Sequence, residues 1–264
     1  MLKQLKTIVR RIGTTVVTAS ELSVTEKEGH ANFVTDMDVR VQRMLMEELN
    51  ALLPEADFIC EEKENEKLSD RATWIVDPID GTTNLIHDYR QSAISVALMR
   101  NQEPVLACVY NPFTDELFSA EKEQGAWLNG KRLSVSQRPL DKALIGFGTA
   151  PYYEELSRAT MRIVYRLLHE AGDVRRSGSA ALDLAYVACG RTDAFFELRL
   201  KPWDVAAGAL LVTEAGGVFT MPLLEKVDFD LSTAVVASNA ECLEGLCQIV
   251  LEEAAGGISL TDAT

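Results

Sequence analysis

Apolar residues near the start of the chain recur every three or four positions, which predicts two amphipathic helices. The first is expected over about residues 1–25, with apolar positions Leu2, Leu5, Ile8, Val9 and Ile12. The second is expected to begin near Thr35, where Thr35 and Asp38 resemble a capping pair, and to end at Pro54. Its apolar positions are Val39, Met44, Leu45, Leu49 and Leu52. The polar, glycine-containing residues 25–38 are predicted to form a loop.

Shorter apolar runs bounded by turn residues follow, and they predict strands. In the first half these runs cover residues 57–62, 73–77, 92–99, 104–110, 116–121 and 125–133. The second half mixes strands at 143–148 and 193–198 with helices at about 152–171, 179–190 and 202–217. Two short strands and a helix over about 239–254 come last, and the tail 256–264 is expected to be frayed.

Helical and extended segments are mixed throughout, and no repeat, linker or charge run divides the chain. This mixing predicts a layered α/β (α+β) structure. We expect one domain over residues 1–264, with two halves of roughly 1–140 and 141–264 that meet near residue 140.

Charge and composition limit the classes of function. The 26 basic and 40 acidic residues give a net charge of −14, so the surface offers no general attraction for nucleic acid or an anionic membrane. No apolar stretch reaches the roughly 18 residues that a transmembrane helix needs. If the substrate is anionic, something local must reverse the sign of the field.

The cysteines and the N-terminus indicate a cytoplasmic protein. The five cysteines form no Cys-x-x-Cys pair, and we expect reduced thiols rather than disulfides or a zinc site. The first residues lack the continuous apolar core of a signal peptide and are predicted to be the start of a helix.

The segment "DPIDGTTN", residues 77–84, carries the candidate chemistry. Pro78 and Gly81 favour a turn that aims Asp77 and Asp80 to one side, with the Ile79 carbonyl between them. Three converging hard oxygens suit Mg²⁺. Asp-Pro and Asp-Gly are also common turn dipeptides, so spacing alone leaves a structural role equally open.

Other acids at the ends of predicted elements favour the metal site over the structural turn. Glu61 and Glu62 end an earlier strand, and Asp204 stands near the start of a later helix. Each of them alone is typical of a solvated surface or of a helix start.

These motifs together resemble the inositol monophosphatase family, the metal-dependent, lithium-sensitive phosphatases related to fructose bisphosphatase. The matching segments are "FVTDMD", two glutamates sixteen residues before Asp77, "DPIDGTTN" and "KPWDVAAGALLVTEAGG". They stand in the family's order, and the resemblance runs from about Lys27 to about Asn239. It implies an alternating αβαβα sandwich of the sugar-phosphatase type, a homodimer, and a small phosphate monoester as substrate.

The resemblance also implies two or three Mg²⁺ ions. Glu61, Asp77 and the backbone carbonyl of Ile79 would bind the first ion. Asp77, Asp80 and Asp204 would bind the second.

The remaining roles are implied by the same resemblance. Thr82 would act with Glu61 to orient and deprotonate the attacking water, and Asp38 would help to hold a further, weaker metal or its waters. Lys27 corresponds to a basic residue near the active-site loop. The residues that would contact the substrate are Gly81, Thr82, Gly178, Ser179, Ala180, Glu197 and Asp204.

One position departs from the family pattern, and the substrate stays open. Cys60 stands where the family usually has glycine before the two glutamates; inward packing and a redox-sensitive thiol are both considered, with packing favoured. Arg175 and Arg176 either steer an anionic substrate or pair with surface acids. Inositol monophosphate is the favoured substrate. The alternative substrates are histidinol phosphate, fructose bisphosphate, the dinucleotide NADP and phosphoadenosine phosphate. The alternative function is that of a regulatory binding protein without turnover.

Overall fold

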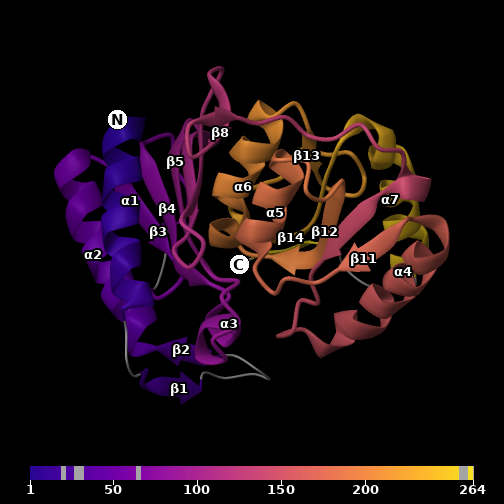
Figure 1. Ribbon diagram of the computed structural model, residues 1–264, viewed down its shortest axis with the longest axis horizontal. Coiled ribbons are helices and arrows are strands. Elements are labelled where there is room, and N and C mark those ends of the chain that lie inside the picture. The colour runs from indigo at the N-terminus through magenta and orange to yellow at the C-terminus, as the bar shows by residue number, and fades with distance from the viewer. Residues whose placement is uncertain (19–21, 27–32, 64–66, 256–260, 264) are drawn as a thin grey trace.

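Two β-sheets organise the chain in the computed structural model, which describes residues 1–18, 22–26, 33–63, 67–255 and 261–263 (Figure 1). The first sheet has the order β3-β4-β5-β6-β7-β8-β9, in which only β3 and β4 are parallel neighbours. Its strands are β3 (Asp57–Cys60), β4 (Thr73–Asp80), β5 (Ala93–Arg100), β6 (Glu103–Asn111), β7 (Glu116–Glu121), β8 (Gly125–Leu128) and β9 (Lys131–Arg132).

The second sheet has the order β11-β10-β12-β14-β13, and β15 pairs with β14. β10 is parallel to both of its neighbours, and the other pairs are antiparallel. Its strands are β10 (Leu144–Phe147), β11 (Asp173–Arg175), β12 (Ala194–Leu200), β13 (Val218–Thr220), β14 (Leu231–Ser238) and β15 (Thr261–Ala263). The chain changes sheet between Arg132 and Leu144, which supports the predicted division near residue 140; the division itself stays a prediction.

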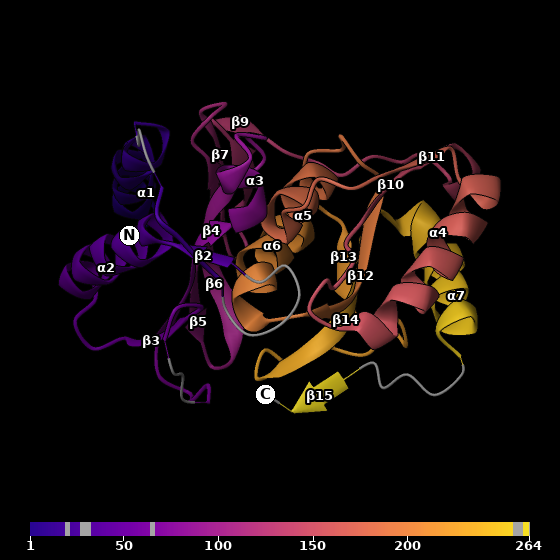
Figure 2. The same cartoon turned by 90° about the horizontal axis from the view of Figure 1, so that it is seen from below.

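Three layers of helices enclose the two sheets (Figures 1 and 2). The outer helices on the first sheet are α1 (Leu2–Val17) and α2 (Asp36–Leu52), and those on the second are α4 (Ser157–Glu170) and α7 (Ala240–Ala254). Between the sheets lie α5 (Ala180–Ala188) and α6 (Pro202–Glu214). Three separate hydrophobic clusters fill the spaces between these layers. The predicted αβαβα sandwich is confirmed.

The central helices are apolar all round because a sheet packs on either side of them. Their small residues let them approach each other closely: a Cβ added at Gly208 would lie 2.4 Å from Cδ1 of Leu184. A larger residue at Gly208 would therefore push α5 and α6 apart, and the site described below depends on the position of both helices.

Several local predictions were correct and several were wrong. Thr35 and Asp38 form the predicted capping box of α2. The first helix ends at Val17 rather than near residue 25. The segment predicted as a loop overlaps β1 (Val24–Glu26) and contains its partner β2 (Phe33–Thr35). The tail is not wholly frayed, because β15 pairs with β14; residues 256–260 and 264 lie outside the described part of the chain.

Val39 was wrongly placed on the buried face of α2, because its side chain is 56% exposed. Leu45 on the same helix is fully buried. Within the described residues, no helix combines the length and the apolar character needed to cross a membrane.

We expect Leu45→Ala to lower the free energy of unfolding by about 3 kcal/mol, because it leaves a cavity between α2 and the first sheet. Val39→Ala on the same helix is the matched control and should change stability by less than about 0.5 kcal/mol. Urea unfolding followed by circular dichroism measures both variants. Equal losses would contradict this account of α2.

Candidate active site

The end of β4 turns two carboxylates to the same side of the first sheet. The pairing of β4 with β5 shifts register between Asp77 and Asp80, and Asp77 Oδ1 accepts the Ile79 N–H at 2.9 Å. Gly81 follows with φ +90°, and a Cβ there would lie 2.9 Å from the Gln91 carbonyl oxygen. The turn that the sequence indicated is thus formed, and it needs glycine at its end.

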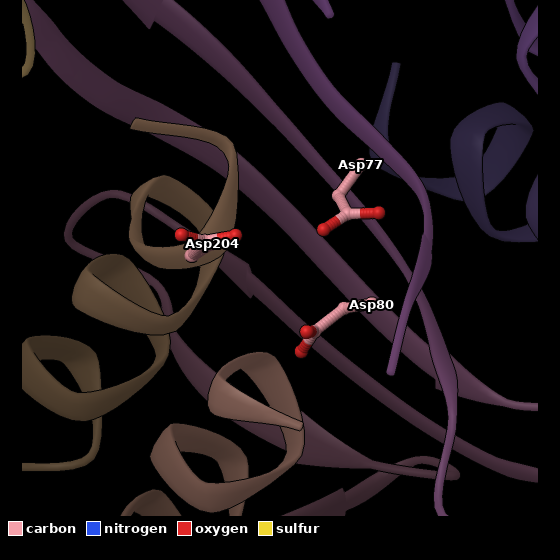
Figure 3. A group of neighbouring side chains, drawn as sticks. All are labelled: Asp77, Asp80 and Asp204. Atoms are coloured by element: carbon pink, nitrogen blue, oxygen red, sulfur yellow. The ribbon is translucent and has the colours of Figure 1, made fainter. Parts of the chain in front are cut away.

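A third carboxylate comes from the central layer (Figure 3). Asp204 lies in the first turn of α6, where its Oδ2 accepts the Lys201 N–H at 2.7 Å. Asp77, Asp80 and Asp204 each offer a carboxylate oxygen, and these oxygens lie within 4.8 Å of one another. Three hard anionic oxygens at this separation repel one another and form a donor set that suits a divalent cation such as Mg²⁺.

The raised pKa of Asp77 agrees with a cation site at this cluster. Asp77 is 2% exposed, and its burial raises the pKa of its carboxyl well above the ordinary value. The charges of Glu61, Asp80 and Asp204 raise the pKa further. Glu61, half-buried directly after β3, therefore acts on the same point, and its N–H donates to the Val76 carbonyl at 3.2 Å.

Thr82 and Asp38 form a second group beside the three acids. The Thr82 hydroxyl lies 2.9 Å from Asp38 Oδ1 and 3.2 Å from the Ile79 carbonyl oxygen, either of which can accept its proton. Asp38 is fully buried, and its Oδ2 accepts the Thr35 N–H at 2.8 Å as well as the Thr35 hydroxyl. Asp38 thus links the start of α2 to Thr82, and its part in metal binding stays a prediction.

A loop from the second half of the chain closes onto Asp80. Ser179, the N-cap of α5, donates its hydroxyl to Asp80 Oδ2 at 2.7 Å, and the Ala181 N–H donates to the same oxygen at 2.7 Å. Burial raises the pKa of Asp80 to about 6 despite these two donors. The predicted substrate loop therefore touches the predicted metal site directly.

The substrate loop is also held from α3 (Thr82–Ile86). The Asn84 side-chain amide donates to the carbonyl oxygens of Gln91 at 2.6 Å and Ser177 at 3.0 Å. Gly178 has φ +84°, and a Cβ there would meet the Asn84 amide at 3.1 Å. Gly178 thus packs closely on α3.

Glu197 lies on β12, on the second-sheet side of the site. It is 7% exposed, and its Oε1 accepts the Ala150 N–H at 2.7 Å. Burial raises the pKa of Glu197 to about 8, and the nearby charges of Asp183 and Asp80 act in the same direction. Glu197 does not belong to the group of three acids with converging oxygens.

Sequence reasoning missed two residues near the site. Asp183 in α5 is 3% exposed, and burial raises its pKa to about 8. The signal was present, since Asp183 is the single charged residue in an otherwise apolar helix. Tyr152 is half-exposed, and its pKa is raised by partial burial and by the charges of Glu61 and Asp204. Nothing in the local pattern pointed to Tyr152.

The structure shows the surroundings of two residues whose roles the sequence left open, Cys60 and Arg175. Cys60 is fully buried in the cluster between α2 and the first sheet, and its pKa is raised to about 12, so inward packing is confirmed and a reactive thiolate is disfavoured. Arg175 is exposed and pairs with Asp173. Lys27 lies outside the described residues.

Comparison with known proteins agrees with the geometry. The model of the inositol monophosphatase family matches residues 1–255. The chain belongs to this family. It is 48% identical over 193 residues to an inositol-1-monophosphatase of Rhizobium meliloti, covering 72% of each chain. It is 38% identical over 229 residues to the Nus factor SuhB of Escherichia coli K12, covering 86% of this chain and 85% of the relative.

Solved structures of the family share the fold over nearly the whole chain. An IMPase of Thermotoga maritima superposes with a TM-score of 0.88 at 32% identity, covering 96% of this chain and 97% of the other. An IMPase/NADP phosphatase in complex with Mg²⁺ and phosphate gives a TM-score of 0.82 at 26% identity, with coverages of 94% and 91%. The αβαβα fold of this chain is therefore the fold of these family structures.

We expect the chelator-treated protein to lose stability as pH rises from about 5 to 8. Folding raises the pKa of Asp183 and Glu197 to about 8, so the folded state retains protons that the unfolded state has released. The stabilisation of the folded state by these two groups is fully present at low pH and is lost as pH rises toward 8. The melting temperature should fall by about 5 °C or more over this range.

Asp183→Asn should flatten this pH dependence, and Asp141→Asn, at an exposed carboxylate, should leave it unchanged. Thermal unfolding in chelator at pH 5, 6, 7 and 8 measures all three proteins. A melting temperature that rises with pH, or an unaltered slope in Asp183→Asn, would contradict the assignment.

Proposed function

We propose that this protein hydrolyses a small phosphate monoester with Mg²⁺, and that inositol monophosphate is its preferred substrate. The observation that carries the proposal is the convergence of Asp77, Asp80 and Asp204 within 4.8 Å beside Thr82. A chain of net charge −14 needs local cations to accept a phosphate dianion, and this cluster is where they would bind.

The acids fit two or three Mg²⁺ ions. Asp77 and Glu61, with the Ile79 carbonyl, would hold one ion, and Asp77, Asp80 and Asp204 would hold another. Bound Mg²⁺ supplies Lewis-acid chemistry: it acidifies water and stabilises the charge on the phosphate and on the leaving alkoxide.

The attacking water is assigned to Thr82 and Glu61. The Thr82 hydroxyl has one proton to give, to Asp38 or to the Ile79 carbonyl, so its lone pairs remain to accept a hydrogen bond from water. Glu61 would take the water proton as general base. Asp38 would act by fixing the Thr82 hydroxyl.

The substrate would be bound from both halves of the chain. The backbone amides of Gly81 and Thr82 are donors for the phosphate oxygens, and the loop of Gly178, Ser179 and Ala180 would lie against the organic part. The Glu197 carboxylate would accept hydrogen bonds from substrate hydroxyls, which favours a polyol phosphate. NADP is retained as an alternative substrate because one of the solved relatives is named an IMPase/NADP phosphatase.

Phosphate release from a substrate panel tests the proposal. The panel contains inositol 1-phosphate, histidinol phosphate, fructose bisphosphate, phosphoadenosine phosphate and NADP, each with Mg²⁺ and with chelator. We expect Mg²⁺-dependent release with inositol 1-phosphate as the best substrate, and inhibition by lithium. A different best substrate would overturn the substrate assignment, and no release from any compound would overturn the reaction.

We expect Asp80→Asn to lower the Mg²⁺-dependent kcat by at least about 10²-fold, because it removes a negative ligand oxygen. Its melting temperature should not fall, since the amide removes one of several mutually repelling charges. Asp141→Asn, at an exposed site, is the control and should keep wild-type kcat. Near-normal turnover by Asp80→Asn would overturn the metal assignment.

A regulatory binding protein is the second candidate, and the relatives named Nus factor SuhB are the observation that favours it. Expression of the Asp80→Asn variant in cells that lack the gene distinguishes a binding function from hydrolysis. A phenotype restored by an inactive variant would favour binding, and failure to restore it would favour hydrolysis.

We also propose a cytoplasmic homodimer, on the family resemblance. Light scattering should give twice the 29.1 kDa mass of one chain. The mass of a single chain would overturn the dimer.

A further inference from the structure

The connection from β10 to α4 is fixed to β12 at three points. β12 carries Glu197 and Arg199, two residues apart on the strand. Glu197 accepts the Ala150 N–H, and the Arg199 guanidinium carbon lies 4.8 Å from the centre of the Tyr153 ring. The Gly148 N–H also donates to the Phe196 carbonyl at 3.1 Å and extends the ladder between β10 and β12. These contacts therefore hold the connection in place beside Glu197.

Gly148 leaves the space that the Glu197 carboxylate fills. A Cβ at Gly148 would lie 1.8 Å from Glu197 Oε2 and 2.0 Å from its Cδ. No side chain can share that space. Because the overlapping atoms are the far end of a flexible side chain, the cheapest response to a larger residue at Gly148 is a different Glu197 rotamer.

Ala150 holds the same carboxylate through its backbone N–H. It has φ +43°, in the left-handed region that alanine disfavours. Ala150 is also 2% exposed, so its surroundings enforce this backbone conformation. The result is an N–H that points at Glu197 Oε1 across 2.7 Å. Strain of this kind persists where the surrounding structure over-determines it, often at functional sites.

We propose that Gly148 and Ala150 are positioning residues: they fix the Glu197 carboxylate and thereby set the preference for esters whose leaving group carries hydroxyls. The inference rests on the proposed function, in which Glu197 binds substrate hydroxyls. The residues proposed to bind the metal ions and the phosphate lie at the ends of β3 and β4 and at the start of α6, so displacement of Glu197 should alter selectivity and leave hydrolysis of a simple ester intact.

The test compares kcat/KM for inositol 1-phosphate and for 4-nitrophenyl phosphate, whose leaving group has no hydroxyl. Gly148→Ala should lower the ratio of the two values by about 10-fold or more, because one well-placed polar contact is lost. Its kcat/KM for 4-nitrophenyl phosphate should stay within about twofold of wild type. A general loss of structure would lower both values together.

A double variant separates positioning from damage to the fold. Glu197→Ala removes the atoms that Gly148→Ala displaces, so adding Gly148→Ala to Glu197→Ala should change the ratio no further. If Gly148→Ala lowers the ratio as much in that background as in wild type, the inference is overturned.

Two further variants serve as controls. Gly146 lies two residues earlier, in β10, where the nearest atom to a new Cβ is a Phe195 ring carbon at 3.3 Å, and Gly146→Ala should keep the wild-type ratio. Ala150→Gly keeps the N–H and suits the positive φ, so its ratio should also stay within about twofold of wild type. A fall in the ratio of Gly146→Ala as large as that in Gly148→Ala would contradict a specific role for Gly148. A fall of that size in Ala150→Gly would contradict the assignment of the Ala150 role to its N–H and backbone conformation.

The proposed function and the inference fail in different ways. If the wild type releases no phosphate from either ester with Mg²⁺, the proposed function is overturned and the inference falls with it. If the wild type hydrolyses both and Gly148→Ala lowers both equally, the inference alone is overturned.

Discussion

The close approach of several buried carboxylates is the constraint on which the rest of the site depends. Asp77 is almost fully buried, and its neighbours add to the cost of ionising it. Hydrogen bonds hold each acid in place: Asp38 through Thr35, Asp80 through Ser179, and Asp204 through Lys201. These bonds fix the positions of the oxygens and leave their negative charge in place. Bound cations would relieve the repulsion that raises the pKa of these carboxyls, which is the physical basis for the proposed Mg²⁺ chemistry.

The acids come from different layers, so the site depends on the packing between them. Asp77 and Asp80 end a strand of the first sheet, Asp204 starts a central helix, and Glu197 lies on the second sheet. The close contact at Gly208 sets the separation of α5 and α6 within the central layer. The bond from Ser179 to Asp80 then joins the two halves at the acids themselves. A change in the packing of the central helices would move Asp204 and Ser179 even where neither residue is altered.

This chain is similar both to proteins named as inositol monophosphatases and to proteins named as Nus factors. The β10–α4 connection contacts Glu197, which in the proposed function would bind the organic part of the substrate rather than the phosphate. Selectivity and hydrolysis would therefore be encoded in separate elements, which lets substrate preference change while the acids on β4 and α6 stay the same.

Short-range interactions were what the sequence by itself determined. The Thr35–Asp38 capping box and the turn through Asp77 and Asp80 form between residues at most a few positions apart, so their spacing in the chain specifies them. The full set of motifs indicated the family. Tertiary structure alone decided that Val39 faces solvent, that Asp183 is buried and that Gly148 lies against Glu197. These outcomes depend on which surface of another element arrives at each position. Gly148 and Glu197 are far apart in the chain, and no local pattern records that one leaves the space that the other fills.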